Sequence, residues 1–454
     1  MPIINSVIVE GGPTPSGTKQ ITTNGIHDVT NYASADVNVP TTAPVHYIEK
    51  SVDANGRLIP GTNLVDLTGV TELPDYALAY AYSTAASHIS VPAFNNVDID
   101  WSGITTCGFQ SLWYTFAYRT GINTFKFGTV GGTLSNCLNC LVATDVKKIE
   151  ILSSNLGDNS GLATDCSSLV EARFPKVTEM KGLCAGGGMF NNCSSLATLY
   201  MPNLEKIVHT TGNSDASPSG SRFLTNNSVI TDVLLPKLSL IQGGKTSGDG
   251  AGKFMFQNCS ALTNLDVRNL TRLVKGSGGS GTTNGVCTSM LLGCTSLVTQ
   301  KFQSLSSISQ GALYYGFYGC TSLQSVWFYA LSSIETNALT GMFKECTNVT
   351  VHFPMALQAS YASDSRFTGG FGGTNTIVLF DLVTSLTGAD TNTYTRQEKD
   401  STSTATAWND GNDTLYYTLG VSDNTNGVNE PSVGDTIYSD AACTTAVTTI
   451  DAIA

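Results

Sequence analysis

The sequence predicts a mainly β solenoid, and two observations support this fold class. A cysteine-led tetrapeptide recurs, and each copy precedes a short apolar run of strand type and then a Leu-x-x-Ile element. The spacing, roughly 23 to 35 residues, is typical of solenoids, in which each repeat adds one turn of chain to a common core. The copies are Cys166-Ser-Ser-Leu169, Cys193-Ser-Ser-Leu196, Cys259-Ser-Ala-Leu262, Cys294-Thr-Ser-Leu297, Cys320-Thr-Ser-Leu323 and Cys346-Thr-Asn-Val349.

The expected turn of chain, here called a rung, is clearest after Cys320. Apolar residues first alternate as in a short parallel strand, continue as a Leu-x-x-Ile element, and end in a segment that we expect to be a turn or short helix. The predicted core positions are Leu323, Val326, Phe328, Leu331, Ile334, Ala338, Met342 and Phe343. Degenerate copies begin at Ala86, Ile122, Val146 and Ile230, the last with Asn227 in the cysteine position. About ten rungs are therefore expected over residues 62–370.

Small all-β modules are expected on both sides of the array. Residues 1–43 contain Asn24-Gly25, a strong hairpin-turn signal, and residues 44–61 have the composition of a linker. Residues 371–454 lose the repeat and contain strand-like runs separated by an Asn/Gly/Asp-rich stretch. They predict a separate C-terminal β domain.

Charge and hydropathy argue against two classes of partner. The chain has 23 Lys plus Arg against 35 Asp plus Glu, a net charge of −12, whereas nucleic-acid binding depends on clustered basic residues. No apolar run of about 18 residues is present, so we expect no membrane insertion. Residues 1–10 lack the basic start of a secretory signal, which favours synthesis in a cytoplasm without export.

Half of the 12 cysteines occupy one repeat position. Stacked side chains point the same way, so their Cβ vectors do not face each other as a disulfide requires. We therefore expect buried free thiols that behave as small hydrophobes. Cys137-Leu-Asn-Cys140 has zinc-knuckle spacing, but no second pair follows it, and no metal site or cofactor is predicted.

The repeat resembles the BspA-type leucine-rich repeat, and this resemblance covers about two thirds of the chain. Residues 17–39 look like a segment of bacteriophage tail-fibre and baseplate-associated proteins, and residues 433–443 resemble C-terminal modules of the same proteins. These resemblances imply a virion tail component, assembled in the bacterial host cytoplasm and joined to other tail or baseplate proteins through residues 1–43. They further imply a receptor-binding or tail-fibre-tip protein that recognises a bacterial surface glycan or protein as a homo-oligomer, commonly a trimer.

Two other functions remain open at this point. A bacterial or protist adhesin with the same repeat would need an export signal. A glycan depolymerase would need two carboxylates across a sugar bond, and Glu150, Glu171 and Asp266 fall at outward strand positions. Solvated surface acids explain the same residues, and no nucleophile or His-acid constellation is evident. We therefore predict no catalytic site and no enzyme activity.

The candidate binding residues lie at outward strand positions and in insertions. Alternation along the strands directs Tyr200, Leu234 and Trp327 outward, where aromatic rings serve as stacking platforms or pack beneath a neighbouring loop or protomer. Insertions at 209–221, 242–252 and 275–285 follow the Leu-x-x-Ile element of successive rungs, so stacking predicts one continuous ridge. The insertions are receptor-reading loops or surface decoration. Their candidate residues are His209, Lys245 and Lys275.

Overall fold

The computed structural model describes most of residues 93–357 and shorter pieces on either side. Gaps in that range are 109–110, 129–131, 135–138, 158–160, 182–187, 210–219, 244–249, 276–284, 336 and 355–356. The shorter pieces are 51–52, 58–59, 64, 67, 71–73, 78, 81–84, 375–380, 385–388, 393–397, 405–409, 414–418, 436–438 and 445–453. The predicted N-terminal module lies outside the described residues.

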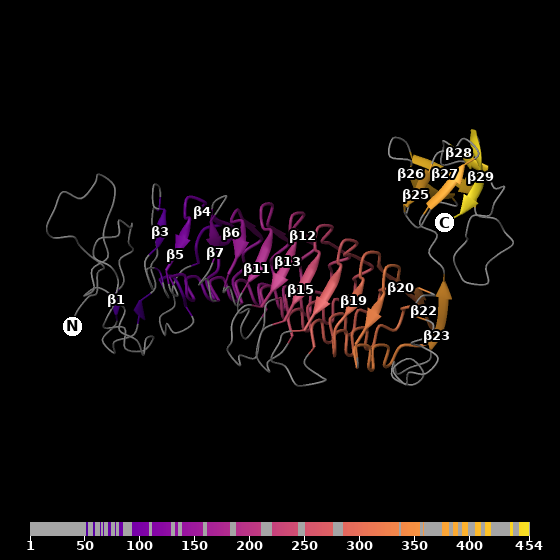
Figure 1. The fold of residues 1–454 in the computed structure, drawn as a ribbon. Helices are drawn as coiled ribbons and strands as arrows, with labels where there is room; N and C mark the ends of the chain where they lie inside the picture. The colour runs from indigo at the N-terminus through magenta and orange to yellow at the C-terminus, as the bar shows by residue number, and fades with distance from the viewer. Residues whose placement is uncertain are drawn as a thin grey trace. The chain divides into compact units, whose positions relative to one another are not determined.

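The repeats form parallel strands, and each rung contributes two of them. The first strands are β4 (Val97–Trp101), β6 (Ile122–Phe127), β8 (Lys148–Ile151), β10 (Glu171–Arg173), β12 (Thr198–Tyr200), β14 (Asp232–Leu234), β16 (Asn264–Asp266), β18 (Thr299–Phe302) and β20 (Ser325–Phe328). The second strands are β5 (Thr106–Cys107), β7 (Thr133–Leu134), β9 (Asn155–Leu156), β11 (Glu179–Lys181), β13 (Lys206–Val208), β15 (Leu240–Gln242), β17 (Arg272–Val274), β19 (Ser307–Ile308) and β21 (Ser333–Ile334). Each lies beside the equivalent strand of neighbouring rungs, in chain order (Figure 1).

The hydrogen-bonded sheets differ in extent. The second strands β7 to β21 form one continuous eight-stranded sheet, whereas the first strands pair as β4 to β12, β14 with β16, and β18 with β20. Farther toward the N-terminus, β3 (Glu72–Leu73) pairs in parallel with β5, and β1 (Ser51–Val52) pairs antiparallel with β2 (Leu58–Ile59). The array is therefore β-rich and dominated by parallel pairing.

The third part of each rung is a run of tight turns. Its N–H groups alternate in direction: that of Tyr318 donates within the rung to the carbonyl of Tyr315 at 3.1 Å. The N–H of Phe317 instead donates to the carbonyl of Met342 in the next rung at 2.9 Å. This alternation satisfies the backbone between rungs without a third strand.

Left-handed residues exclude a helix from these turn segments. Tyr315 has φ 53° and Gly319 has φ 69°, and the same pair of positions is left-handed in Phe254 and Asn258. An L-residue helix cannot continue through such positions. The expected turn or short helix is thus a turn segment, and no α-helix occurs among the described residues.

Seven of the eight predicted core positions of the rung that follows Cys320 are buried, as expected. The exception is Ile334, which is only half-buried on β21 near the end of the parallel array. The end of the Leu-x-x-Ile element, however, lies in the second strand, such as β19 at Ser307–Ile308, and the sequence analysis did not assign this strand. The isoleucine of the element is the strand residue that points into the core, so the next residue along the strand points outward.

The cysteines at the repeat position are buried and free, as predicted for that column. They are not merely small hydrophobes, because each sulfur lies within hydrogen-bond distance of a carbonyl in the preceding rung. The acceptors are Leu141 for Cys166, Ala163 for Cys193, Leu224 for Cys259, Phe256 for Cys294, Leu291 for Cys320 and Phe317 for Cys346, at 2.8 to 3.0 Å. The thiol therefore combines an apolar volume with a donor.

The C-terminal part contains a second compact unit, which comprises Thr350–Ala362 and Thr376–Ala454. It contains most of β22 (Val349–Pro354) and of β23 (Asn375–Phe380). Its six remaining strands form a closed antiparallel barrel: β24 (Ser385–Gly388), β25 (Thr393–Gln397), β26 (Ala405–Asn409), β27 (Thr414–Thr418), β28 (Thr436–Tyr438) and β29 (Ala446–Ile453). No described helix has the length and apolarity needed to span a bilayer.

Candidate binding face

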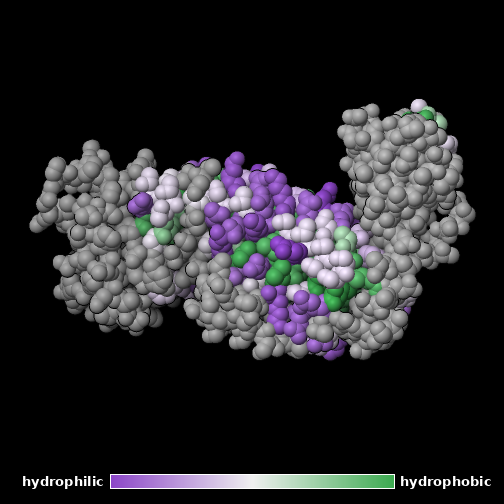
Figure 2. All heavy atoms as spheres, in the orientation of Figure 1, coloured by the Kyte–Doolittle hydropathy of each residue, from purple (hydrophilic) through white to green (hydrophobic). Residues whose placement is uncertain are grey.

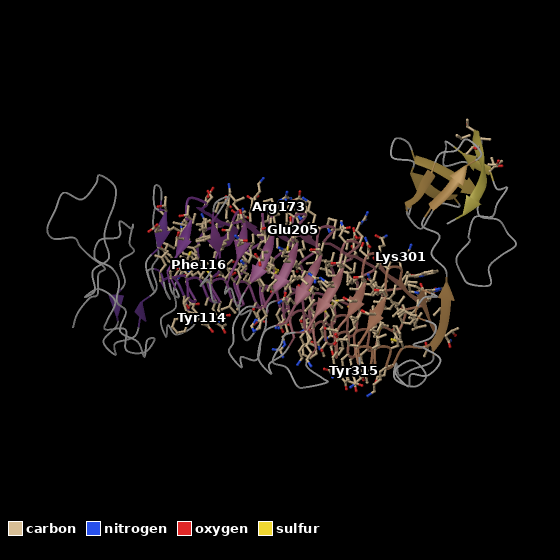
Figure 3. All side chains as sticks on the ribbon, in the orientation of Figure 1. Tyr114, Phe116, Arg173, Glu205, Lys301 and Tyr315 are labelled. Carbon is tan, nitrogen blue, oxygen red and sulfur yellow. The ribbon has the colours of Figure 1, made fainter. Side chains whose placement is uncertain are left out.

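The outward side chains of the first strands form columns, because parallel pairing keeps equivalent residues in register. Lys126 pairs with Glu150, Glu150 with Arg173, and Arg173 with Tyr200. Leu234 occupies the equivalent position of β14 and pairs with Asp266. We call this outward side of the first strands the binding face, because it carries the candidate binding residues Tyr200, Leu234 and Trp327; Figure 3 labels Arg173 and Lys301 along it.

The middle of the binding face exposes two large apolar side chains. Tyr200 is 40% exposed and Leu234 is 48% exposed, while Leu199 and Val233 beside them are buried. The guanidinium of Arg173 lies 4.6 Å from the centre of the Tyr200 ring, in cation–π geometry. The predicted outward direction of Tyr200 and Leu234 is therefore confirmed. In the orientation of Figure 2, hydrophilic residues prevail along the upper edge of the central rungs.

Trp327 is outward but only half-exposed. Its ring stacks on the buried Tyr329 with centroids 5.5 Å apart and an angle of 12° between the planes. Lys301 is its in-register partner on β18. Because the indole packs against Tyr329, its role is partly structural, and Tyr200 is the more exposed of the two aromatic side chains.

Two of the three acidic residues considered for a glycosidase, Glu171 and Asp266, are paired with basic residues. Glu171 accepts a hydrogen bond from Arg173 at 3.0 Å, and the Lys148 ammonium lies 3.4 Å away. The hydrogen bond from Arg173 lowers the pKa of Glu171. Asp266 is bound by Arg268 at 2.8 Å. A glycosidase acid needs a raised pKa, so these contacts favour surface ion pairing over the two-carboxylate interpretation.

The three insertions start side by side. They follow β13, β15 and β17, in which Val208 pairs with Gln242 and Gln242 with Val274. Stacking of their starting points agrees with a ridge, although 210–219, 244–249 and 276–284, with Lys245, lie outside the described residues. Lys275 is half-buried, and its ammonium donates to Gln310 at 2.9 Å.

His209 corrects the sequence analysis. It was expected at the surface of the first insertion, but its side chain is only 6% exposed. Its backbone N–H donates to the carbonyl of Gln242 at 3.0 Å, which continues the contact between β13 and β15 by one residue. His209 therefore belongs to the end of a strand and does not form part of a surface that reads a ligand.

An exposed polar ladder at the turn segments was not predicted. The Asn192 amide donates to Asp165 at 2.7 Å, that of Asn226 to Asn192 at 2.7 Å, and that of Asn258 to Asn226 at 2.9 Å. Each residue precedes the repeat cysteine position and has positive φ. The sequence signal was the Asp or Asn at this position in four successive repeats, which tolerates the left-handed region.

Comparison with protein-family models, curated proteins and solved structures finds no match. Within the described part of the chain, no group of three or more His, Cys, Asp or Glu side chains is arranged to hold a metal ion. The functional interpretation therefore depends on the binding face itself.

Proposed function

We propose that this chain is a non-enzymatic recognition protein of a bacteriophage tail, a receptor-binding or fibre-tip component. In this proposal the repeats form a BspA-type leucine-rich-repeat solenoid whose binding face contacts the bacterial surface. The observation that carries it is the exposure of Tyr200 and Leu234 at equivalent positions of successive first strands. Residues on a stacked β scaffold are held in fixed positions, which lowers the entropy lost when a ligand binds.

The pairing of charges on the same face supports recognition over hydrolysis. Lys126 with Asp100, Lys148 with Glu171 and Arg268 with Asp266 are ion pairs at 2.8 to 3.6 Å. A ligand on this face would therefore contact paired charges and, at the centre, the exposed apolar side chains of Tyr200 and Leu234. Incubation with purified capsule or wall polysaccharide should therefore release no reducing ends, and release would favour the depolymerase instead.

The decisive experiment measures binding of the labelled full chain to a panel of intact bacterial strains by flow cytometry. For a strain that binds, the double variant Tyr200→Ala/Leu234→Ser should lose about tenfold in affinity, because central aromatic and apolar contacts dominate interfaces. Val229→Ser is the matched control, since Val229 is 44% exposed and lies outside the strand column. If the double variant binds as the parent does, the face is a spacer and residues 371–454 become the favoured receptor-binding part.

Residues 1–43 are proposed as the module that attaches the chain to other tail or baseplate proteins. Assembly would take place in the host cytoplasm, and the oligomer to test first is a trimer. A chain that starts at residue 44 should keep cell binding and lose incorporation into particles. Cell binding lost with normal incorporation would reverse the assignment. An adhesin, the alternative, would be found on the surface of the cell that makes it and not in a virion fraction.

A further inference from the structure

Three tyrosines form a cluster at the turn segment before Cys320, apart from the binding face. The ring of Tyr315 lies 4.2 Å from that of Tyr314 and 5.7 Å from that of Tyr318, both edge to face. All three side chains are partly exposed. In Figure 3, Tyr315 lies at the lower edge of the rungs and Lys301 at the upper edge, so the cluster is a separate surface.

The cluster already holds a cation from the next rung. The Lys344 ammonium lies 5.6 Å from the centre of the Tyr315 ring and 5.5 Å from that of Tyr318. The Tyr318 hydroxyl donates to the carboxylate of Glu345. Aromatic faces and a carboxylate both attract positive charge, so Tyr315, Tyr318 and Glu345 together have the composition of an ammonium site.

The Tyr315 ring is held in place because the residue beside it in the next rung, Gly341, has no side chain. A Cβ atom on Gly341, whose φ is +64°, would lie 2.3 Å from Cε1 of Tyr315. The Tyr315 ring therefore occupies the space that a side chain of the next rung would fill. A ring held in this way loses little freedom when a ligand arrives.

We propose that Tyr315, Tyr318 and Glu345 form a binding site for a quaternary ammonium group, in which Lys344 is a displaceable resident cation. Lys344 is exposed, so its stem can turn into water. A primary ammonium is strongly hydrated and gains little from leaving water for a ring face. A trimethylammonium group is less hydrated and covers more of each ring, so it should replace Lys344. Aromatic cages are the known protein solution for this chemical group.

Choline is the probe, measured by ligand-observed NMR on the full chain, and 3,3-dimethylbutan-1-ol is its uncharged control of equal shape. Choline should bind at least about fivefold more tightly than the alcohol, since the attraction is electrostatic. Lys344→Ala should raise choline affinity about threefold by removing the competitor. Equal binding of choline and the alcohol, or absence of choline binding in both parent and Lys344→Ala, would overturn the proposal.

Two further variants separate the site from folding. Tyr318→Phe keeps the ring and should keep most of the binding, whereas Tyr318→Ala should lose it with little change in melting temperature. Gly341→Ala should displace the Tyr315 ring and weaken choline binding, while other rungs show that this position accepts Arg222 and Phe254. Choline affinity unchanged in Tyr318→Ala or Gly341→Ala would also overturn the assignment. The result does not depend on the proposed tail function, because it is measured without cells.

Discussion

The thiol of Cys320 donates a hydrogen bond to the carbonyl of Leu291 in the preceding rung, with the sulfur 3.0 Å from the oxygen. The same carbonyl also accepts the backbone N–H of Cys294 at 3.1 Å. Cys346 repeats this arrangement on the carbonyl of Phe317. The cysteine column thus links successive rungs through donors, and burial raises the pKa of the Cys346 thiol to about 11, which keeps it protonated.

Substitution of Cys320 distinguishes a donor from a purely apolar side chain. Cys320→Ala removes the donor and some volume, and should lower the free energy of unfolding by about 1 to 3 kcal/mol. Cys320→Ser has a side chain only slightly larger than that of alanine but keeps a hydrogen-bond donor. The serine variant should therefore be more stable than the alanine variant by about 0.5 to 1.5 kcal/mol. Urea unfolding under reducing conditions measures both. A serine variant less stable than alanine would mean that the thiol acts only by its apolar volume.

Asn227 interrupts the column in an informative way. Its amide nitrogen donates to Phe190 at 2.8 Å, as a thiol would, but its Oδ1 is buried without a hydrogen-bond partner. Asn227→Cys should therefore keep the donor, remove the unsatisfied oxygen and raise the free energy of unfolding by about 1 kcal/mol. Asn227→Ala, which also loses the donor, is the control and should be less stable than Asn227→Cys. Equal stability of the parent and Asn227→Cys would show that the oxygen costs nothing.

The asparagine ladder can be divided into its hydrogen bonds and its backbone conformation. Asn192 bonds to Asp165 on one side and Asn226 on the other, and its φ is 60°. Asn192→Gly removes both bonds and keeps the left-handed region, with an expected loss of about 0.5 to 1.5 kcal/mol. Asn192→Ala should lose about 1 to 2 kcal/mol more, because a Cβ without a local hydrogen bond disfavours this region. Equal losses in thermal melts would contradict the conformational part.

His352 on β22 predicts a pH dependence. Burial lowers the pKa of His352 from its usual 6.5 to about 4. The unfolded chain therefore binds a proton at a higher pH than the folded chain does, so stability should fall as pH falls from about 6.5 to about 4. In His352→Gln the melting temperature should change less between pH 6.5 and pH 4 than in the parent, when each protein is referenced to its own melting temperature at pH 7.5. A parent and variant with parallel profiles would show that other groups govern the acid range.

The repeat predicted side-chain directions as well as rung spacing, because residues of the same type recur at equivalent positions of successive rungs. Leu199 inward and Tyr200 outward followed from alternation alone, and both are found so. Alternation could not tell how far a large outward ring folds back, so the stacking of Trp327 on Tyr329 was missed. The burial of His209 was missed for a related reason: its polar neighbours suggested a loop, whereas pairing with the next rung extends past the end of β13.

The sequence by itself determined the β-rich rungs, most of their core positions and the burial of the cysteine column, because these follow from local periodicity and residue volume. Tertiary structure alone decided which groups from different rungs meet. The second strand sheet, the thiol-to-carbonyl bonds, the asparagine ladder and the Tyr315 ring over Gly341 all join residues separated by a full rung. A linear pattern shows what recurs, but contact between recurrences depends on the exact stacking of one turn of chain on the next, which sets distances of a few ångströms that no local periodicity encodes.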